Sequence, residues 1–278
     1  MESHPVDENA VIVSWDAWLA SPPGRYLLEW EQAQYDRTVG DIFGYHALQL
    51  GMPQLPCLRE NRIPWKDLVL DERPAAASPE DAGEDAASAL SLSLCRFDEL
   101  PFESQSIDLV VLPHVLEFAA DPHAVLREVE RVLVPEGQVV LTGFNPMSLW
   151  GLREGCARLF GAERFVPRDG QFLAPARIKD WLKLLGFDIG RGRFGCYRPA
   201  YHSEKWLGRS ALLEKAGDRW WPIFGATYML SGVKRVRGMR LVGPAWKDKA
   251  SKAGAAAPAL VPSSHPRSPA GKITQQGN

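Results

Sequence analysis

The sequence predicts an α/β fold in which a parallel β-sheet carries helices on its faces. Between residues 98 and 145, an apolar strand at Ile107–Leu112 is followed by an amphipathic helix at Pro122–Leu133 and a second apolar strand at Val139–Phe144. Two apolar strands joined by a helix over this length are typical of a βαβ unit, whose strands run parallel. Parallel-sheet proteins usually bind ligands beyond the carboxyl ends of their strands, so we expect the site on that edge.

Before this unit, the chain predicts one helix and three strands. Residues 22–39 predict a helix, because two prolines suit its first turn and apolar residues mix with acidic and polar ones. Short apolar stretches at 45–50, 66–70 and 90–97 predict strands. A short helix is predicted over 56–62, starting at Pro56. Residues 73–88 hold no large apolar side chain, so we expect a mobile loop there.

Beyond residue 144, the chain predicts two helices and two further strands, which brings the strand count to seven. Asn145 and Pro146 suit the cap and first position of a helix that runs to about residue 160. Residues 175–185 carry one apolar face and end before Gly186, a typical helix stop. The strands are predicted at 187–194 and 227–236, with an aromatic insertion at 200–222 between them.

Composition favours an ordinary globular protein. The chain is 45% apolar and 24% charged, with a formal net charge of -2. Its four cysteines lie far apart and none has a metal-ligand spacing, so we predict no metal site and a reducing, cytoplasmic location. The first residues show no secretory signal, and no apolar run approaches the roughly 18 residues of a membrane span.

The charge is distributed unevenly along the chain. Residues 234–278 carry nine Lys and Arg against one Asp, whereas the rest of the chain is acidic. We interpret residues 247–278 as a disordered, basic tail that is simply solvated, and we do not expect a nucleic-acid partner.

The residues from 100 to 146 resemble a known family. LPFESQSIDLVVLPHVLEF and the following DPHAVLREVERVLVPEGQVVLTGFNP are similar to class I S-adenosylmethionine-dependent methyltransferases, in the branch of the ubiquinone and sterol enzymes (the type 11 methyltransferase domain). The resemblance implies a Rossmann-like three-layer sandwich with a seven-stranded, mostly parallel sheet and one antiparallel strand. Residues 1–40 would then be a helical lead-in and residues 41–246 the methyltransferase-like domain.

The resemblance also implies a site for S-adenosylmethionine at the ends of the first four strands. Gly51 matches the first glycine of the family's turn, where a Cβ would block the ligand. Asp71 matches the carboxylate that accepts from both ribose hydroxyls. The predicted cofactor-binding residues are Gly51, Asp71, Phe97, Asp98 and Pro113.

Part of the cofactor motif departs from the family pattern. The usual D-x-G-x-G-x-G turn is replaced by LQLGMPQLP, with Gln49 at the acidic position. Arg96 stands where the family usually has an acidic residue at the adenine end.

Methyl transfer depends mainly on holding donor and acceptor in line, and a base is needed only if the acceptor must lose a proton. His114 is the predicted catalytic base, because it follows the fourth strand and histidine titrates near neutral pH. The alternative is a histidine that is merely hydrogen-bonded within its loop. Glu117 is a weaker candidate base and is expected instead to be a solvated or capping residue. The tryptophans near the expected acceptor pocket either line it or pack a lid; they are Trp150, Trp206, Trp220 and Trp221.

The sequence therefore predicts an S-adenosylmethionine-dependent methyltransferase that acts on a small-molecule acceptor. A catalytically inactive methyltransferase-like binding or scaffold protein is the main alternative, because the glycine-rich turn is incomplete. A nicotinamide-dependent enzyme would need a GxGxxG turn after the first strand, which is absent. A nucleic-acid methyltransferase is supported only by the basic tail.

Overall fold

The computed structural model describes residues 15–71, 90–160, 165–166, 170–190, 192–200 and 211–236. All of them belong to one compact unit, Met1–Arg237. The predicted mobile loop at 73–88, the predicted basic tail at 247–278 and part of the 200–222 insertion lie outside the described residues.

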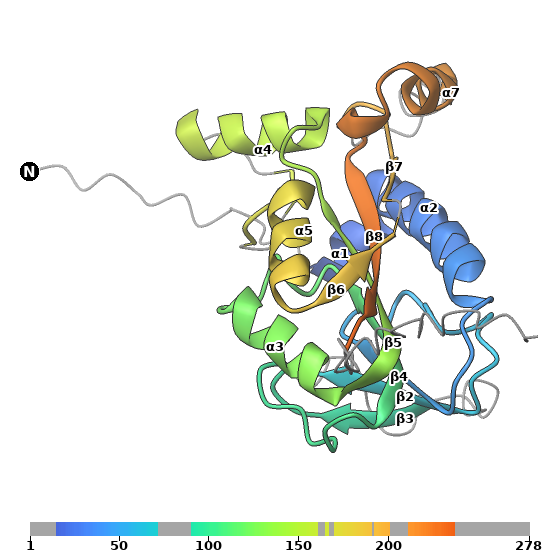
Figure 1. Ribbon diagram of the computed structural model, residues 1–278. Coiled ribbons are helices and arrows are strands. Elements are labelled where there is room, and N and C mark those ends of the chain that lie inside the picture. The colour runs from blue at the N-terminus through green and yellow to red at the C-terminus, as the bar shows by residue number, and fades with distance from the viewer. Residues whose placement is uncertain are drawn as a thin grey trace, which may run out of the picture. The chain divides into compact units, whose positions relative to one another are not determined.

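A mixed eight-stranded sheet forms the middle layer of this unit (Figure 1). Its strands are β1 His46–Leu50, β2 Trp65–Leu70, β3 Leu90–Leu94, β4 Ile107–Pro113, β5 Leu133–Phe144, β6 Phe187–Ile189, β7 Arg193–Gly195 and β8 Thr227–Lys234. The order is β3-β2-β1-β4-β5-β8-β6, and β7 also pairs with β8. Strands β1 to β5 are parallel, whereas β8 runs antiparallel to β5, β6 and β7. The predicted mostly parallel sheet with one antiparallel strand is therefore confirmed.

The predicted strand at 187–194 is divided into two short strands. β6 and β7 are separated at residues 190–192, and both pair with β8, through Asp188↔Val233 in β6 and Phe194↔Tyr228 in β7. The interruption gives eight strands instead of the seven that were counted from the sequence.

Seven described helices flank the sheet. They are α1 Trp15–Ala20, α2 Pro22–Val39, α3 Pro122–Val132, α4 Leu149–Phe160, α5 Pro175–Leu184, α7 Ala211–Trp220 and the short 3₁₀ helix η1 Pro222–Phe224. The helices predicted at 22–39 and 175–185 are confirmed. Asp121 caps α3, because its side chain accepts hydrogen bonds from the backbone N–H groups of His123 (2.9 Å) and Ala124 (3.1 Å).

Two local predictions are wrong. The helix predicted to begin at Asn145–Pro146 begins instead at Leu149, and the Ser148 hydroxyl accepts from the backbone N–H of Gly151 (3.0 Å) as its cap. The Asn145 side chain makes other contacts: its oxygen accepts from the backbone N–H of Met147 (3.1 Å) in a turn, and its NH2 group donates to the carbonyls of Ile223 (2.7 Å) and Gly225 (3.0 Å). The short helix predicted over 56–62 is absent from the described residues, which form turns there.

The sheet separates two apolar cores, as adjacent residues of β4 illustrate. Leu109 and Val111 pack into the core beneath α1 and α2, whereas Val110 and Leu112 face the core beneath α3 and α5. In Figure 1, α2 and α3 lie on opposite sides of the sheet, so the unit is a three-layer sandwich. No helix in the described residues is long and apolar enough to cross a membrane.

Candidate functional site

The sequence-predicted residues follow strands that are neighbours in the sheet. Gly51 follows β1, Asp71 follows β2, Phe97 and Asp98 follow β3, and Pro113 ends β4. The backbone N–H of Gly51 donates to the carbonyl of Val69 (2.7 Å), and that of Cys95 donates to the carbonyl of Leu70 (3.0 Å). Because these strands are parallel and adjacent, their carboxyl ends form one edge of the sheet, where ligands of this class of fold bind.

The turn after β1 adopts a conformation that favours glycine. Gly51 has φ +70°, in the left-handed region that L side chains rarely adopt. A Cβ at this position would lie 3.4 Å from Val115 Cγ2 and 3.6 Å from Phe97 Cζ. The turn therefore lies against an apolar surface formed by residues that follow β3 and β4.

Gln49 organises the loop that replaces the glycine-rich motif. Its buried side-chain amide donates to the carbonyls of Gly51 (3.2 Å), Met52 (3.1 Å) and Leu55 (2.9 Å), and its oxygen accepts from the backbone N–H of Cys57 (3.1 Å). A carboxylate has no proton to donate to these three carbonyls. An amide at this position, in place of the family's acidic residue, therefore makes the hydrogen bonds that this loop needs.

The two predicted carboxylates at this edge differ in their engagement. Asp71 is exposed and makes no hydrogen bond or ion pair with any residue that the structure describes. Asp98 binds the guanidinium of Arg96 through both oxygens, with Nε–Oδ1 at 3.0 Å and Nη2–Oδ2 at 2.5 Å. The hydrogen bond from Arg96 lowers the pKa of Asp98. Arg96 is therefore neutralised by its neighbour, whereas Asp71 has no such partner among the described residues.

His114 lies between two buried carboxylates. Its Nδ1 is 2.7 Å from Glu117 Oε2 and its Nε2 is 2.7 Å from Glu31 Oε1. Burial alone would lower the pKa of His114, but the charges of Glu31 and Glu117 and their hydrogen bonds raise it to about 10. At neutral pH the ring is thus a cation with both nitrogens occupied. It can act as the predicted base only after it has lost its proton to another group.

Glu31, His114 and Glu117 are called the buried triad below, and they connect four elements. The Thr227 hydroxyl at the start of β8 donates to Glu31 Oε1 (3.0 Å), and the backbone N–H of Phe144 at the end of β5 donates to Glu117 Oε1. Glu117, expected to be solvated or a helix cap, is instead buried. Glu31 Oε2 is buried and has no hydrogen-bond partner among the described residues.

Sequence reasoning missed Glu31 because it lies 83 residues before His114. One signal was available. Leu27, Glu31 and Tyr35 are four residues apart, so they share one face of α2, and all three are buried. An acidic residue on the apolar face of a predicted helix indicates a buried partner.

Aromatic side chains cover the triad. The Trp15 ring of α1 lies 6.2 Å from the His114 ring and 5.3 Å from the Phe118 ring, and Phe144 lies 4.3 Å from His114 between ring centroids. Of the four tryptophans considered from the sequence, Trp150 is fully buried, Trp220 and Trp221 are exposed, and Trp206 lies outside the described residues. The end of β4 is therefore enclosed mainly by α1 and β5.

Comparison with known proteins identifies the family. A methyltransferase domain model matches residues 70–141, from the end of β2 into β5. The uncharacterized protein YafS of Escherichia coli K12 is 40% identical over 179 residues, which cover 64% of this chain and 67% of YafS. An uncharacterized Mycobacterium tuberculosis protein is 27% identical over 198 residues, which span 67% of this chain and 61% of that protein.

Solved structures share the fold. An S-adenosylmethionine-dependent methyltransferase from Mesorhizobium loti aligns with a TM-score of 0.51 and 16% identity, covering 74% of this chain and 97% of its own. Phosphoethanolamine N-methyltransferase 2 of Haemonchus contortus, in complex with phosphomonomethylethanolamine and S-adenosylhomocysteine, aligns with a TM-score of 0.52 and 16% identity over 81% of this chain and 61% of its own. The domain match and the 40% identity to YafS show that the chain belongs to a methyltransferase-domain family, and the solved structures show that it shares the fold of class I S-adenosylmethionine-dependent methyltransferases.

Proposed function

We propose that this protein transfers a methyl group from S-adenosylmethionine to a small-molecule acceptor. The observation that carries the proposal is the juxtaposition of the left-handed Gly51 turn with the Asp71 carboxylate, which has no partner among the described residues, at the ends of two paired strands. Gly51 would let the ligand approach the backbone, and Asp71 would accept from the ribose hydroxyls. Phe97 would supply an apolar surface, with Asp98 and Pro113 beside it. The bound cofactor supplies an electrophilic methyl group on a sulfonium.

On the acceptor side, the buried triad and the rings around it would exclude water and orient the acceptor. Glu31 Oε2 is the triad atom without a hydrogen bond in the described part of the chain, so it is the atom best placed to accept one from the acceptor. In this scheme the positive charge of His114 offsets one of the two negative charges of the carboxylates. Its predicted role as the base would require transfer of its own proton to one of them first.

Equilibrium binding of S-adenosylhomocysteine to the full chain tests the cofactor site. Asp71→Asn should weaken binding about 10- to 100-fold, because hydrogen bonds to a charged group contribute about 1.5–3 kcal/mol. Asp67→Asn, on the same strand but before its carboxyl end, is the matched control and should bind as the wild type does. Undetectable wild-type binding at millimolar ligand would refute the cofactor assignment, and full affinity in Asp71→Asn would refute the ribose contact alone.

A catalytically inactive, methyltransferase-like binding protein is the second candidate. The loop after β1 favours this candidate, because three carbonyls of the loop already accept hydrogen bonds from Gln49. Incubation with methyl-labelled S-adenosylmethionine and a small-molecule extract separates the two functions. Labelled product that requires Asp71 supports the enzyme, whereas binding of S-adenosylhomocysteine without any transfer supports the binding protein.

We also propose a cytoplasmic location. All four cysteines are in described residues and are free, which suits a reducing compartment.

A further inference from the structure

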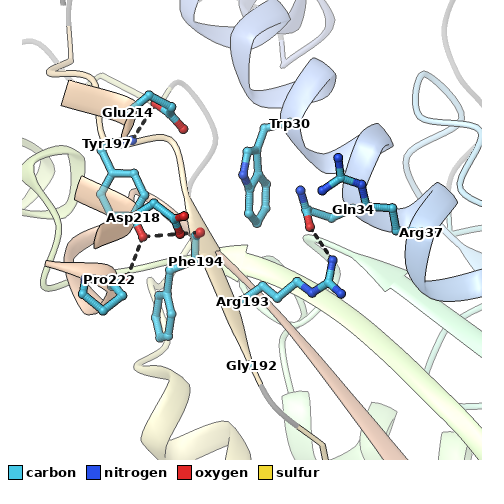
Figure 2. Close-up of a pocket in the computed structure, with 10 residues that line it drawn as sticks. All are labelled: Trp30, Gln34, Arg37, Gly192, Arg193, Phe194, Tyr197, Glu214, Asp218 and Pro222. Carbon is cyan, nitrogen blue, oxygen red and sulfur yellow. Dashed lines mark hydrogen bonds between the residues drawn. The ribbon is translucent and has the colours of Figure 1, made fainter. Parts of the chain in front are cut away.

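A cavity of about 490 Å³ lies between α2, β7 and the segment from α7 to η1 (Figure 2). α2 contributes Trp30, Gln34 and Arg37, which are four and three residues apart and so lie on one face of the helix. β7 contributes Arg193 and Phe194. In the described part of the chain, none of the residues proposed to hold the cofactor lines this cavity, nor does any member of the buried triad.

The charged groups of the cavity are grouped by sign. Arg37 and Arg193 lie beside Gln34, whereas Glu214 and Asp218 of α7 lie on the other side of the Trp30 indole in the view of Figure 2. Arg193 Nη1 donates to Gln34 Oε1 at 2.9 Å. Within the described ranges, neither of these arginines forms an ion pair with a carboxylate, and Asp218 forms none with a basic residue. Glu214 is paired with Arg198 (Nε–Oε2 4.0 Å), so among the described residues the two arginines and Asp218 are the charges of this cavity that remain available to a ligand.

The aromatic centre of the cavity is fixed by a close backbone contact. The Trp30 indole packs directly on Gly195 of β7, where a Cβ would come within 2.0–2.5 Å of three ring atoms. Only glycine allows the ring to lie there. The indole therefore presents a flat apolar surface between the arginines and the carboxylates, and its face can also attract a cation.

The acidic end is held by hydrogen bonds. The Glu214 carboxylate accepts from the backbone N–H groups of Cys196 and Tyr197, both at 3.3 Å, and from the Tyr26 hydroxyl. The Tyr197 ring is buried, and its hydroxyl donates to the carbonyl of Pro222 (2.9 Å). These hydrogen bonds therefore fix the Glu214 carboxylate and the Tyr197 ring at this end of the cavity.

We propose that this cavity binds a small zwitterion that carries its anionic and ammonium groups at opposite ends. The anionic group would contact Arg37 and Arg193, the carbon chain would lie along Trp30, and the ammonium would face Asp218 and Glu214. A simple anion would place charge near the carboxylates, and a simple cation would place charge near the guanidinium groups, so each would bind less well. The cavity volume lies in the range of small-molecule pockets, about 300–1,000 Å³. The proposal does not rest on methyl transfer.

Binding of three probes of matched length tests the proposal: 6-aminohexanoate, hexanoate and hexylamine, titrated into the full chain without cofactor. The zwitterion should bind about tenfold more tightly than either singly charged probe, a difference of about 1.4 kcal/mol, since it makes one additional charged contact. Arg193→Gln should abolish the preference over hexylamine, and Asp218→Asn should abolish the preference over hexanoate.

Controls make the outcome decisive. Arg62→Gln, at an exposed arginine outside the cavity, should leave all three affinities unchanged. Arg193 and Asp218 are exposed, so their substitution should preserve the fold, which circular dichroism checks. Equal affinities for the three probes would overturn the proposal, as would no binding of 6-aminohexanoate at tens of millimolar or a preference that survives both substitutions.

Discussion

A rise in pH above neutrality should destabilise this fold, because the folded chain keeps a proton on His114, between Glu31 and Glu117, that the unfolded chain has lost. The folded-state pKa of His114 is about 10, against 6.5 for the free side chain. Each pKa unit corresponds to about 1.4 kcal/mol, so the bound proton contributes about 5 kcal/mol to the free energy of unfolding. Because the folded-state pKa is raised, this contribution is fully present below pH 6.5 and is lost as pH rises through about 10.

The assay is urea unfolding at a series of pH values, with the imidazole followed by NMR. Between pH 7 and 8.5 the unfolding free energy should fall by about 1.4 kcal/mol per pH unit, because the unfolded chain has lost the proton that the folded chain keeps. Measurements stop there because burial also raises the pKa values of Cys57 and Cys196, which would add losses of the same sign at higher pH.

Glu31→Gln is the matched variant, since it keeps the shape of the side chain and removes one of the two carboxylates that hold the proton. Its unfolding free energy should depend less steeply on pH, and its His114 ring should titrate at lower pH than the wild-type ring. The reasoning is refuted if the wild-type His114 ring titrates near pH 6.5, or if the wild type and Glu31→Gln lose stability equally with pH.

Three further outcomes are expected. Gln49→Glu should lower the unfolding free energy by about 2–3 kcal/mol, because the carboxylate cannot donate to the three loop carbonyls; a loss below about 0.5 kcal/mol in urea unfolding would contradict this role. Gly195→Ala should displace the Trp30 indole, lower stability by about 1–3 kcal/mol and change tryptophan fluorescence, so an unchanged spectrum would argue against the packing. Gly51→Val should weaken S-adenosylhomocysteine binding at least tenfold by calorimetry, because a β-branched residue is strained at φ +70°. Unchanged affinity would show that this turn does not contact the ligand.

Much of the fold could be predicted because its signals are local. The apolar face and flanking glycine of 175–185 and the apolar runs of β1 and β4 depend only on residues close in sequence. Asn145 shows where such reasoning fails. Its position favours a helix cap, but its oxygen accepts from Met147 in a turn and its NH2 group donates to Ile223 and Gly225, nearly 80 residues later.

The candidate site likewise contains residues that local sequence patterns predict and residues whose roles depend on distant contacts. Gly51 and Asp71 were predicted because the family pattern fixes their distance from the ends of strands. Glu31 was not, since its role depends on how α2 packs against the sheet, and that packing leaves only a weak trace in the sequence. Gln49 was recognised as a departure, but its meaning required the path of the loop that it bonds.

The position of β8 has a consequence for the order in which the protein can fold. Within the described residues, β6 and β7 pair with no strand except β8, and β8 also covers the outer edge of β5. During synthesis, β1 to β5 can pair as soon as they leave the ribosome. The part of the sheet formed by β6, β7 and β8 cannot pair until Lys234, the last residue of β8, has emerged. β8 also brings Thr227 to Glu31, so the buried triad gains its last hydrogen bond only when the final strand is inserted. Completion of the buried triad and closure of the sheet are therefore a single folding event.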